Sequence, residues 1–148
     1  MLKKIFAVML TAVCAQSALA ADYTAYFRFD TAIIGRSATA VLEAMSRDIR
    51  FPECTRIQLI GHACDLGDSP YNMDLGQMRA DAMKEQLILR GFNPDNIEFK
   101  SVGDTDPIVP NDTEEHRKLN RSLEVIILPR ESWYRDFKCN QELRDLKD

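Results

Sequence analysis

Each patterned segment of this chain has only one apolar face, and this feature restricts the folds that the chain can adopt. Alternating apolar and polar residues are typical of strands covered on one side, and helical spacing of apolar residues is typical of amphipathic helices. The predicted strands are residues 23–29, 56–60, 96–102 and 122–128, and the predicted helices are residues 37–49 and 75–90. Because each element has one face to bury, the economical packing places both helices on one side of a small mixed sheet. The sequence therefore predicts an α+β fold, a two-layer sandwich in the order β-α-β-α-β-loop-β.

The segment 75–90 has the clearest helical pattern of the chain. Gly91 follows it at the position that favours a left-handed C-cap, and Pro94 prevents the helix from continuing. The predicted buried stripes are Val41, Leu42, Met45 and Ile49 in the first helix, and Leu75, Met78, Ala82 and Leu89 in the second. Residues 103–120 contain two prolines and many charges, so this stretch is predicted to be a loop.

The amino terminus has the pattern of a secretory signal peptide. Two lysines precede an apolar run, Ile5 to Ala15, and Ala18-Leu19-Ala20 forms a small-x-small cleavage site. The run is well short of the roughly 20 residues that span a bilayer. We therefore predict a signal peptide at residues 1–20. A lipoprotein anchored at Cys14 is the alternative, although Val13 is larger than the residue that such processing prefers.

Charge and composition argue against several functional classes. Removal of residues 1–20 leaves 17 of the 19 basic residues against 23 acidic ones, a formal net charge of −6. An acidic chain gives no general reason to expect nucleic-acid binding. The four cysteines include no CxxC pair, so a structural zinc site is not expected. No cofactor is predicted.

Several landmarks in one register resemble the OmpA-like family of cell-wall-binding domains. The central landmarks are Gly61-His62-Ala63-Cys64-Asp65-Leu66-Gly67, Tyr71-Asn72, Leu75 and Arg79-Ala80. Further landmarks are Phe27-Arg-Phe-Asp30, Val102-Gly-Asp-Thr-Asp-Pro107-Ile, Asn111-Asp-Thr113 and Asn120-Arg121-Ser-Leu-Glu124-Val. The resemblance implies a mixed four-stranded sheet with the helices on one side, over residues 21–129. Residues 130–148 would then form a charged C-terminal tail.

The resemblance also implies non-covalent binding of peptidoglycan, chiefly of the diaminopimelate in its stem peptide. In the family, an aspartate of the first turn and an arginine of the next helix hold this ligand. Arg79 matches that arginine, Asn72 and Leu75 match their landmarks, and Arg121 matches the first arginine after Asn120. A zwitterionic ligand needs an acceptor for its ammonium and a cation for its carboxylate, and arginine offers a planar fork for the latter.

The chain departs from the family pattern at the ligand-binding aspartate. Cys64 occupies that position in gapless register, and Asp65 lies one residue further on. Asp65 or Asp68 reaching into the site would restore the missing carboxylate. Ser122 also replaces the usual second arginine of the last strand.

Some polar residues have structural alternatives. His62 is interpreted as a turn residue that packs the end of the second strand, because no nucleophile with an orienting group accompanies it. Arg117 is interpreted as structural. For Arg121, ligand binding and neutralisation of Glu114, Glu115 and Glu124 both remain open. No catalytic residue is predicted, and a redox or covalent role for Cys64 is disfavoured.

Three cysteines follow the predicted signal peptide, and an oxidising compartment favours pairing two of them. Cys54 and Cys64 flank the second strand and would lie about 30 Å apart at about 3.3 Å per residue, beyond the roughly 7 Å limit for bridged Cα atoms. The resemblance implies that the last strand runs antiparallel beside the second. Cys139 would then be near Cys54, and we predict a Cys54–Cys139 disulfide that staples the tail.

The sequence thus favours a periplasmic, non-enzymatic domain that binds peptidoglycan and tethers an envelope assembly to the cell wall. Its protein partner would belong to an envelope-spanning or outer-membrane complex and would dock on the charged tail. The alternative is the same fold without wall binding, acting as a protein-interaction subunit of a secretion or motility apparatus. A thiol-dependent enzyme that uses Cys64 is a third possibility.

Overall fold

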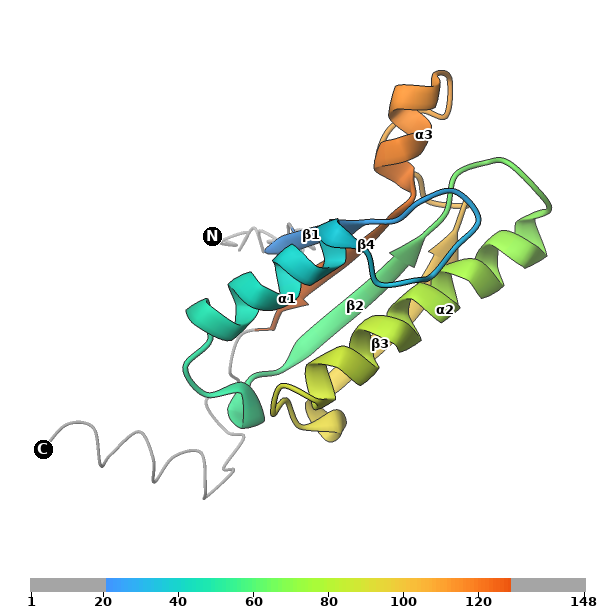
Figure 1. Cartoon of the computed structure of the whole chain (residues 1–148). Helices are drawn as coiled ribbons and strands as arrows, with labels where there is room; N and C mark the ends of the chain where they lie inside the picture. Colours follow the sequence, from blue (N-terminus) through green and yellow to red (C-terminus); the bar gives the residue numbers. More distant parts are fainter. Residues whose placement is uncertain (1–20, 129–148) are drawn as a thin grey trace, which may run out of the picture.

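The computed structural model describes residues 21–128 as one four-stranded sheet with two helices on one face (Figure 1). The elements are β1 (Tyr23–Tyr26), α1 (Arg36–Asp48), η1 (Pro52–Cys54), β2 (Ile57–His62), α2 (Ser69–Ile88), η2 (Pro94–Asn96), β3 (Ile97–Gly103), α3 (Glu114–Asn120) and β4 (Ser122–Ile127). The predicted α+β class and the two-layer arrangement are confirmed.

The sheet is mixed, as predicted, with the strand order β1-β4-β2-β3. β2 pairs in parallel with β3 and antiparallel with β4, while β1 pairs antiparallel with β4. The register Ile57↔Ile127 and the hydrogen bond from the Leu128 amide to the Arg56 carbonyl place the exit of β4 beside the entry of β2. This is the geometry on which the Cys54–Cys139 pairing was based. Cys139 lies outside the described residues, so the pairing stays a prediction.

The core lies between the sheet and the two long helices. The sheet contributes alternate side chains such as Leu59, Leu123 and Val125, all fully buried. From α1 come Leu42 and Met45, with Val41 and Ile49 partly buried against them, so the predicted stripe of the first helix is confirmed. No helix in residues 21–128 is both long and apolar enough to cross a membrane. The predicted signal peptide and charged tail lie outside the described residues.

The predicted buried stripe of α2 is wrong. Of its four residues, Leu75 is buried, but Met78 and Leu89 are 47% and 77% exposed. The buried face consists of Asn72, Leu75, Gly76, Arg79, Ala80, Met83 and Leu87. Two polar residues and a glycine lie on this face, and a pattern of apolar residues alone therefore assigns the wrong orientation. The helix also begins at Ser69, six residues before the predicted start.

Helix α3 lies in the stretch that was predicted to be a loop. The Thr113 side chain caps it by accepting a hydrogen bond from the His116 amide at 3.1 Å. Two glutamates occupy its first turn and two basic residues its last turn, an order that suits the helix dipole. Asn120 then fixes the preceding loop through bonds to both backbone groups of Val109.

Helix α2 and strand β2 approach each other backbone to backbone at Gly61 and Gly76. A Cβ added to Gly61 would lie 1.9 Å from the Gly76 carbonyl oxygen, and one added to Gly76 would lie 2.8 Å from the Gly61 carbonyl oxygen. Neither position therefore has room for a side chain. This contact brings the first turns of α2 against the end of β2, where the candidate site lies.

We expect Gly76→Ser to lower the free energy of unfolding by about 1–3 kcal/mol, the usual cost of an overpacked interior. The matched control is Gly35→Ser, because a Cβ at Gly35 would meet nothing within 4 Å and serine is a favoured N-cap residue. Denaturant unfolding of both variants checks this prediction. Equal effects of the two substitutions would contradict it.

Candidate functional site

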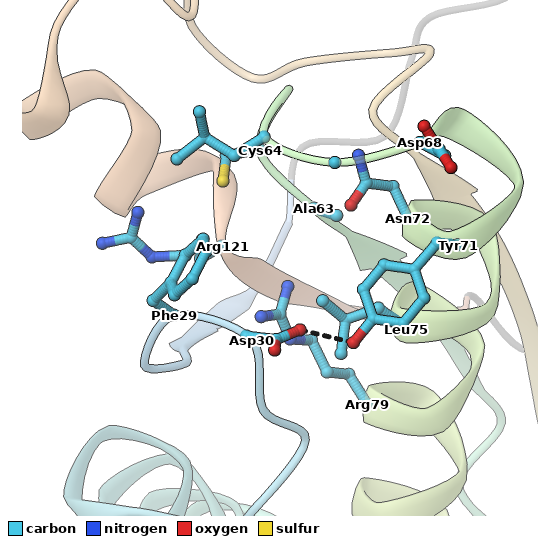
Figure 2. A pocket seen from close by; sticks show the side chains of 12 residues that line it. Phe29, Asp30, Ala63, Cys64, Asp68, Tyr71, Asn72, Leu75, Arg79 and Arg121 are labelled. Carbon is cyan, nitrogen blue, oxygen red and sulfur yellow. Dashed lines mark hydrogen bonds between the residues drawn. The ribbon is translucent and has the colours of Figure 1, made fainter.

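A pocket of about 390 Å³ opens where β2 ends and α2 begins (Figure 2). It is lined by Phe29, Asp30, Ala63, Cys64, Leu66, Gly67, Asp68, Tyr71, Asn72, Leu75, Arg79 and Arg121. These residues come from the β1–α1 connection, the turn after β2, the first half of α2 and the residue just before β4. Of the predicted site residues, the pocket brings together Cys64, Asn72, Arg79 and Arg121. Asp65 does not line it.

Arg79 forms the floor of the pocket and is fully buried. Its guanidinium donates hydrogen bonds to three backbone carbonyls: Nη1 to His62 at 2.6 Å, Nε to Thr31 at 3.0 Å and Nη2 to Arg28 at 3.4 Å. It also lies 5.1 Å from the centre of the Phe27 ring. Burial lowers the pKa of Arg79 to about 10. Arg79 therefore clamps the β1–α1 connection onto the end of β2, and only part of its fork remains for a ligand.

Arg121 contributes the second buried guanidinium of the site. The residue is only 5% exposed, and its Nη2 donates to Glu114 Oε1 at 2.9 Å. Its Nε and Nη1 have no hydrogen-bond partner within the described part of the chain. Burying such donors without a partner is costly. Of the two roles left open by the sequence, neutralisation by Glu114 accounts for one nitrogen, and ligand binding by the other two stays a prediction.

The turn after β2 separates Cys64 from Asp65. Cys64 is 4% exposed, and Figure 2 shows its sulfur directed into the pocket. The Asp65 carboxylate lies outside, where its Oδ1 accepts a hydrogen bond from Arg117 Nε at 2.9 Å. Cys64 and Asp65 therefore face different sides of the turn, and Asp65 pairs with Arg117 of α3. The interpretation of Arg117 as structural fits this contact, whereas Asp65 as a pocket carboxylate does not.

Two carboxylates, Asp30 and Asp68, line the pocket. Asp30 was not among the predicted site residues, and Asp68 was named only as an alternative to Asp65. Asp30 accepts a hydrogen bond from the Tyr71 hydroxyl. Figure 2 shows this bond as a dashed line across the mouth of the pocket. This hydrogen bond raises the pKa of Tyr71. Asp30 has a φ of 50°, a left-handed conformation that is uncommon outside glycine. The signal for Asp30 was present, because Phe27-Arg-Phe-Asp30 is one of the family landmarks. Asp68, the residue before α2, also lines the pocket.

Asn72 and His62 hold the surrounding backbone. Asn72 is buried, and its Nδ2 donates to Asp104 Oδ2 at 3.3 Å. Hydrogen bonds from Ser69 and then Asn72 lower the pKa of Asp104. His62 Nδ1 lies 3.2 Å from the Asp106 carbonyl oxygen, and His62 Nε2 lies 2.9 Å from Glu124 Oε2. His62 is the last residue of β2 and not a turn residue, and it packs the end of that strand.

The pocket therefore combines two buried guanidinium groups with two carboxylates at its mouth. Such a set can hold the carboxylate and the ammonium of one zwitterionic group at the same time. Among residues 21–128, no cluster of three or more His, Cys, Asp or Glu side chains could hold a metal ion.

The fold defines an α+β domain with a pocket at the end of β2, and the chain belongs to the OmpA family, which it matches over residues 26–121. It is 32% identical over 110 residues to the peptidoglycan-associated lipoprotein of Pseudomonas aeruginosa, covering 74% of this chain and 65% of the relative. It is 31% identical over 110 residues to the protein of that name from Pseudomonas putida, covering 74% and 66%. The match thus spans just under two thirds of each relative.

Solved structures show the same fold. The peptidoglycan-associated lipoprotein of Burkholderia pseudomallei superposes with a TM-score of 0.66 at 26% identity, covering 72% of this chain and 90% of that one. The C-terminal domain of Helicobacter pylori MotB gives a TM-score of 0.64 at 25% identity, covering 84% and 95%. The expected family and its sheet topology are thereby confirmed.

We predict that Arg79→Lys destabilises the domain by about 2–4 kcal/mol, because a single ammonium cannot satisfy three divergent buried carbonyls. Arg90→Lys is the matched control. Arg90 lies just after the end of α2, and its Nη1 donates to the carbonyl and the side-chain oxygen of Gln86 at 2.8 and 2.9 Å, so its contacts are local. Denaturant unfolding at neutral pH is the measurement, and similar losses in the two variants would argue against the clamp.

Proposed function

We propose that this pocket binds the stem peptide of peptidoglycan at the zwitterionic end of its diaminopimelate. The observation that carries the proposal is that two buried guanidinium groups, Arg79 and Arg121, line the same pocket as the Asp30 carboxylate, and that two nitrogens of Arg121 have no hydrogen-bond partner among the described residues. Relatives of this chain are named peptidoglycan-associated lipoproteins, which supports the same ligand class.

The ligand would be held by charge at two points. Its carboxylate accepts hydrogen bonds from Arg121 Nε and Nη1 and from what remains of the Arg79 fork. Its ammonium lies at the mouth of the pocket and donates to Asp30, with Asp68 as a second acceptor. Asn72 and Leu75 line the same pocket from α2.

Cys64 weakens this binding relative to an aspartate at the same position. A charge-assisted hydrogen bond contributes roughly 1.5–3 kcal/mol, so its loss lowers affinity about 10- to 150-fold. Many copies in one assembly would compensate through avidity. The chain then acts without catalysis, as an exported periplasmic domain that tethers an envelope complex to the wall.

Cys64 and Ser122 are also the observations that favour the second candidate, an OmpA-like domain that has lost wall binding and serves only as a protein-interaction subunit. The two candidates differ in one measurable quantity, the affinity of the protein for wall fragments that contain diaminopimelate.

The test is binding of the purified protein to sacculi and to a soluble diaminopimelate muropeptide, measured by pull-down and calorimetry. We expect Arg121→Met to weaken muropeptide binding at least about tenfold, because it removes a charged donor of the ligand carboxylate. Arg117→Met is the matched control, since Arg117 pairs with Asp65 outside the pocket, and it should leave the affinity unchanged.

A second matched pair separates the candidate carboxylates. Asp30→Asn should weaken muropeptide binding, whereas Asp65→Asn should not. The reverse result would return the ammonium site to Asp65. Absence of any wall binding by the unmodified protein would favour the protein-interaction subunit instead.

We further expect Cys64→Asp to strengthen muropeptide binding about tenfold or more, because it adds an acceptor opposite the ligand ammonium. Cys64→Ser provides the control of similar size without a charge and should change the affinity little. Calorimetry with the same muropeptide measures both. An unchanged affinity in Cys64→Asp would show that position 64 does not face the ligand.

A further inference from the structure

A second hollow lies on the far side of Phe29 and Arg121, which form the wall that it shares with the first pocket. Its volume is about 1060 Å³, and it is bordered by the β1–α1 connection and by α3, which stand next to each other at one end of the sheet (Figure 1). We call it the α3 groove. Its lining residues are Tyr26, Phe27, Arg28, Phe29, Thr31, Ile33, Gly35, Arg36, Ser37, Lys118, Leu119 and Arg121.

The charge of the α3 groove is opposite to that of the chain. Arg28, Arg36, Lys118 and Arg121 line it, and no aspartate or glutamate does, although the chain as a whole has a formal net charge of −4. Within the described part of the chain, no ion pair neutralises Arg28, Arg36 or Lys118. A local excess of uncompensated cations selects and steers an acidic partner.

The groove also exposes large apolar side chains. Ile33 is 78% exposed and Phe29 is 59% exposed, and Tyr26 and Leu119 add further apolar surface. Ile33 is not part of the buried core. Grouped, exposed apolar residues with a polar rim are typical of protein interaction sites. Carbohydrate alone offers little to such side chains, whereas a peptide supplies both carboxylates and apolar groups.

A peptide bound in the α3 groove would be held by side-chain contacts and not by pairing as an additional strand of the sheet. β1 is an edge strand, but the Tyr26 amide that borders the groove donates to Ser37 Oγ at 2.9 Å. Arg121 also lines the groove, but its Nη2 is paired with Glu114. The carboxylates of the occupant are therefore expected to pair with Arg28, Arg36 and Lys118.

From these observations we propose that the α3 groove docks an acidic, partly apolar segment of a partner protein. The site is separate from the proposed wall-binding pocket and goes beyond it, because it supplies the protein end of the tether. Arg28, Arg36 and Lys118 pair with the acidic side chains, while Ile33, Phe29 and Leu119 bury the apolar ones.

The test selects random dodecapeptides displayed on phage with the full chain, and then measures the resynthesised peptides by fluorescence anisotropy. We expect selected peptides to be rich in Asp and Glu together with Leu, Ile or aromatic residues. Lys118→Glu should weaken their binding about tenfold. Lys100→Glu is the matched control, because it makes the same charge change on the exposed face of β3, at the opposite edge of the sheet.

An apolar pair completes the design. Ile33→Ser should weaken peptide binding several-fold, and Leu89→Ser, which removes a side chain that is 77% exposed elsewhere, should not. Recovery of basic peptides, of no peptides, or of acidic peptides that bind both lysine variants equally would overturn the proposal. Lys118→Glu should leave muropeptide affinity unchanged, so failure of the groove and failure of the wall site are distinguishable.

Discussion

Helix α2 touches β2 through the backbones of Gly61 and Gly76, and Arg79 follows one turn later on the same buried face. From there its guanidinium reaches the carbonyl of His62 and two carbonyls of the β1–α1 connection. Three segments that are distant in sequence are thereby joined behind the pocket. The mouth residues Asp30 and Tyr71 are positioned by this clamp, because the connection that bears Asp30 is the one that Arg79 holds.

The division of labour between the two arginines follows from their surroundings. Arg79 is surrounded by carbonyl oxygens and is mainly structural, although it forms the floor of the pocket. Arg121 donates to one carboxylate oxygen, that of Glu114, and its other two nitrogens have no hydrogen-bond partner among residues 21–128. The sequence resemblance assigned the carboxylate fork to Arg79, and under the proposed function the larger part of that role belongs to Arg121.

The regular elements were predictable from the sequence because their patterns are local. The strands and the stripe of α1 follow from alternation and helical spacing, and Gly91 and Pro94 mark the end of α2. The face of α2 was not predictable in this way, since Asn72 and Arg79 are buried only because tertiary partners satisfy them. Helix α3 has few apolar residues, so no apolar stripe indicates it. The sequence feature that indicates its start is the N-cap Thr113 followed by two glutamates. The separate roles of Asp30 and Asp65 depend on which side of a turn each faces, and spacing alone does not determine that.

The lack of space at Gly61 and Gly76 separates the parts of this domain that can vary from those that cannot. Any side chain at either glycine would push the helix away from the sheet and displace the guanidinium behind it. Position 64 lies in front of this contact, and a change there alters the chemistry of the mouth without moving the scaffold. Ligand preference in such a domain can therefore drift by single substitutions during evolution while its architecture stays constant.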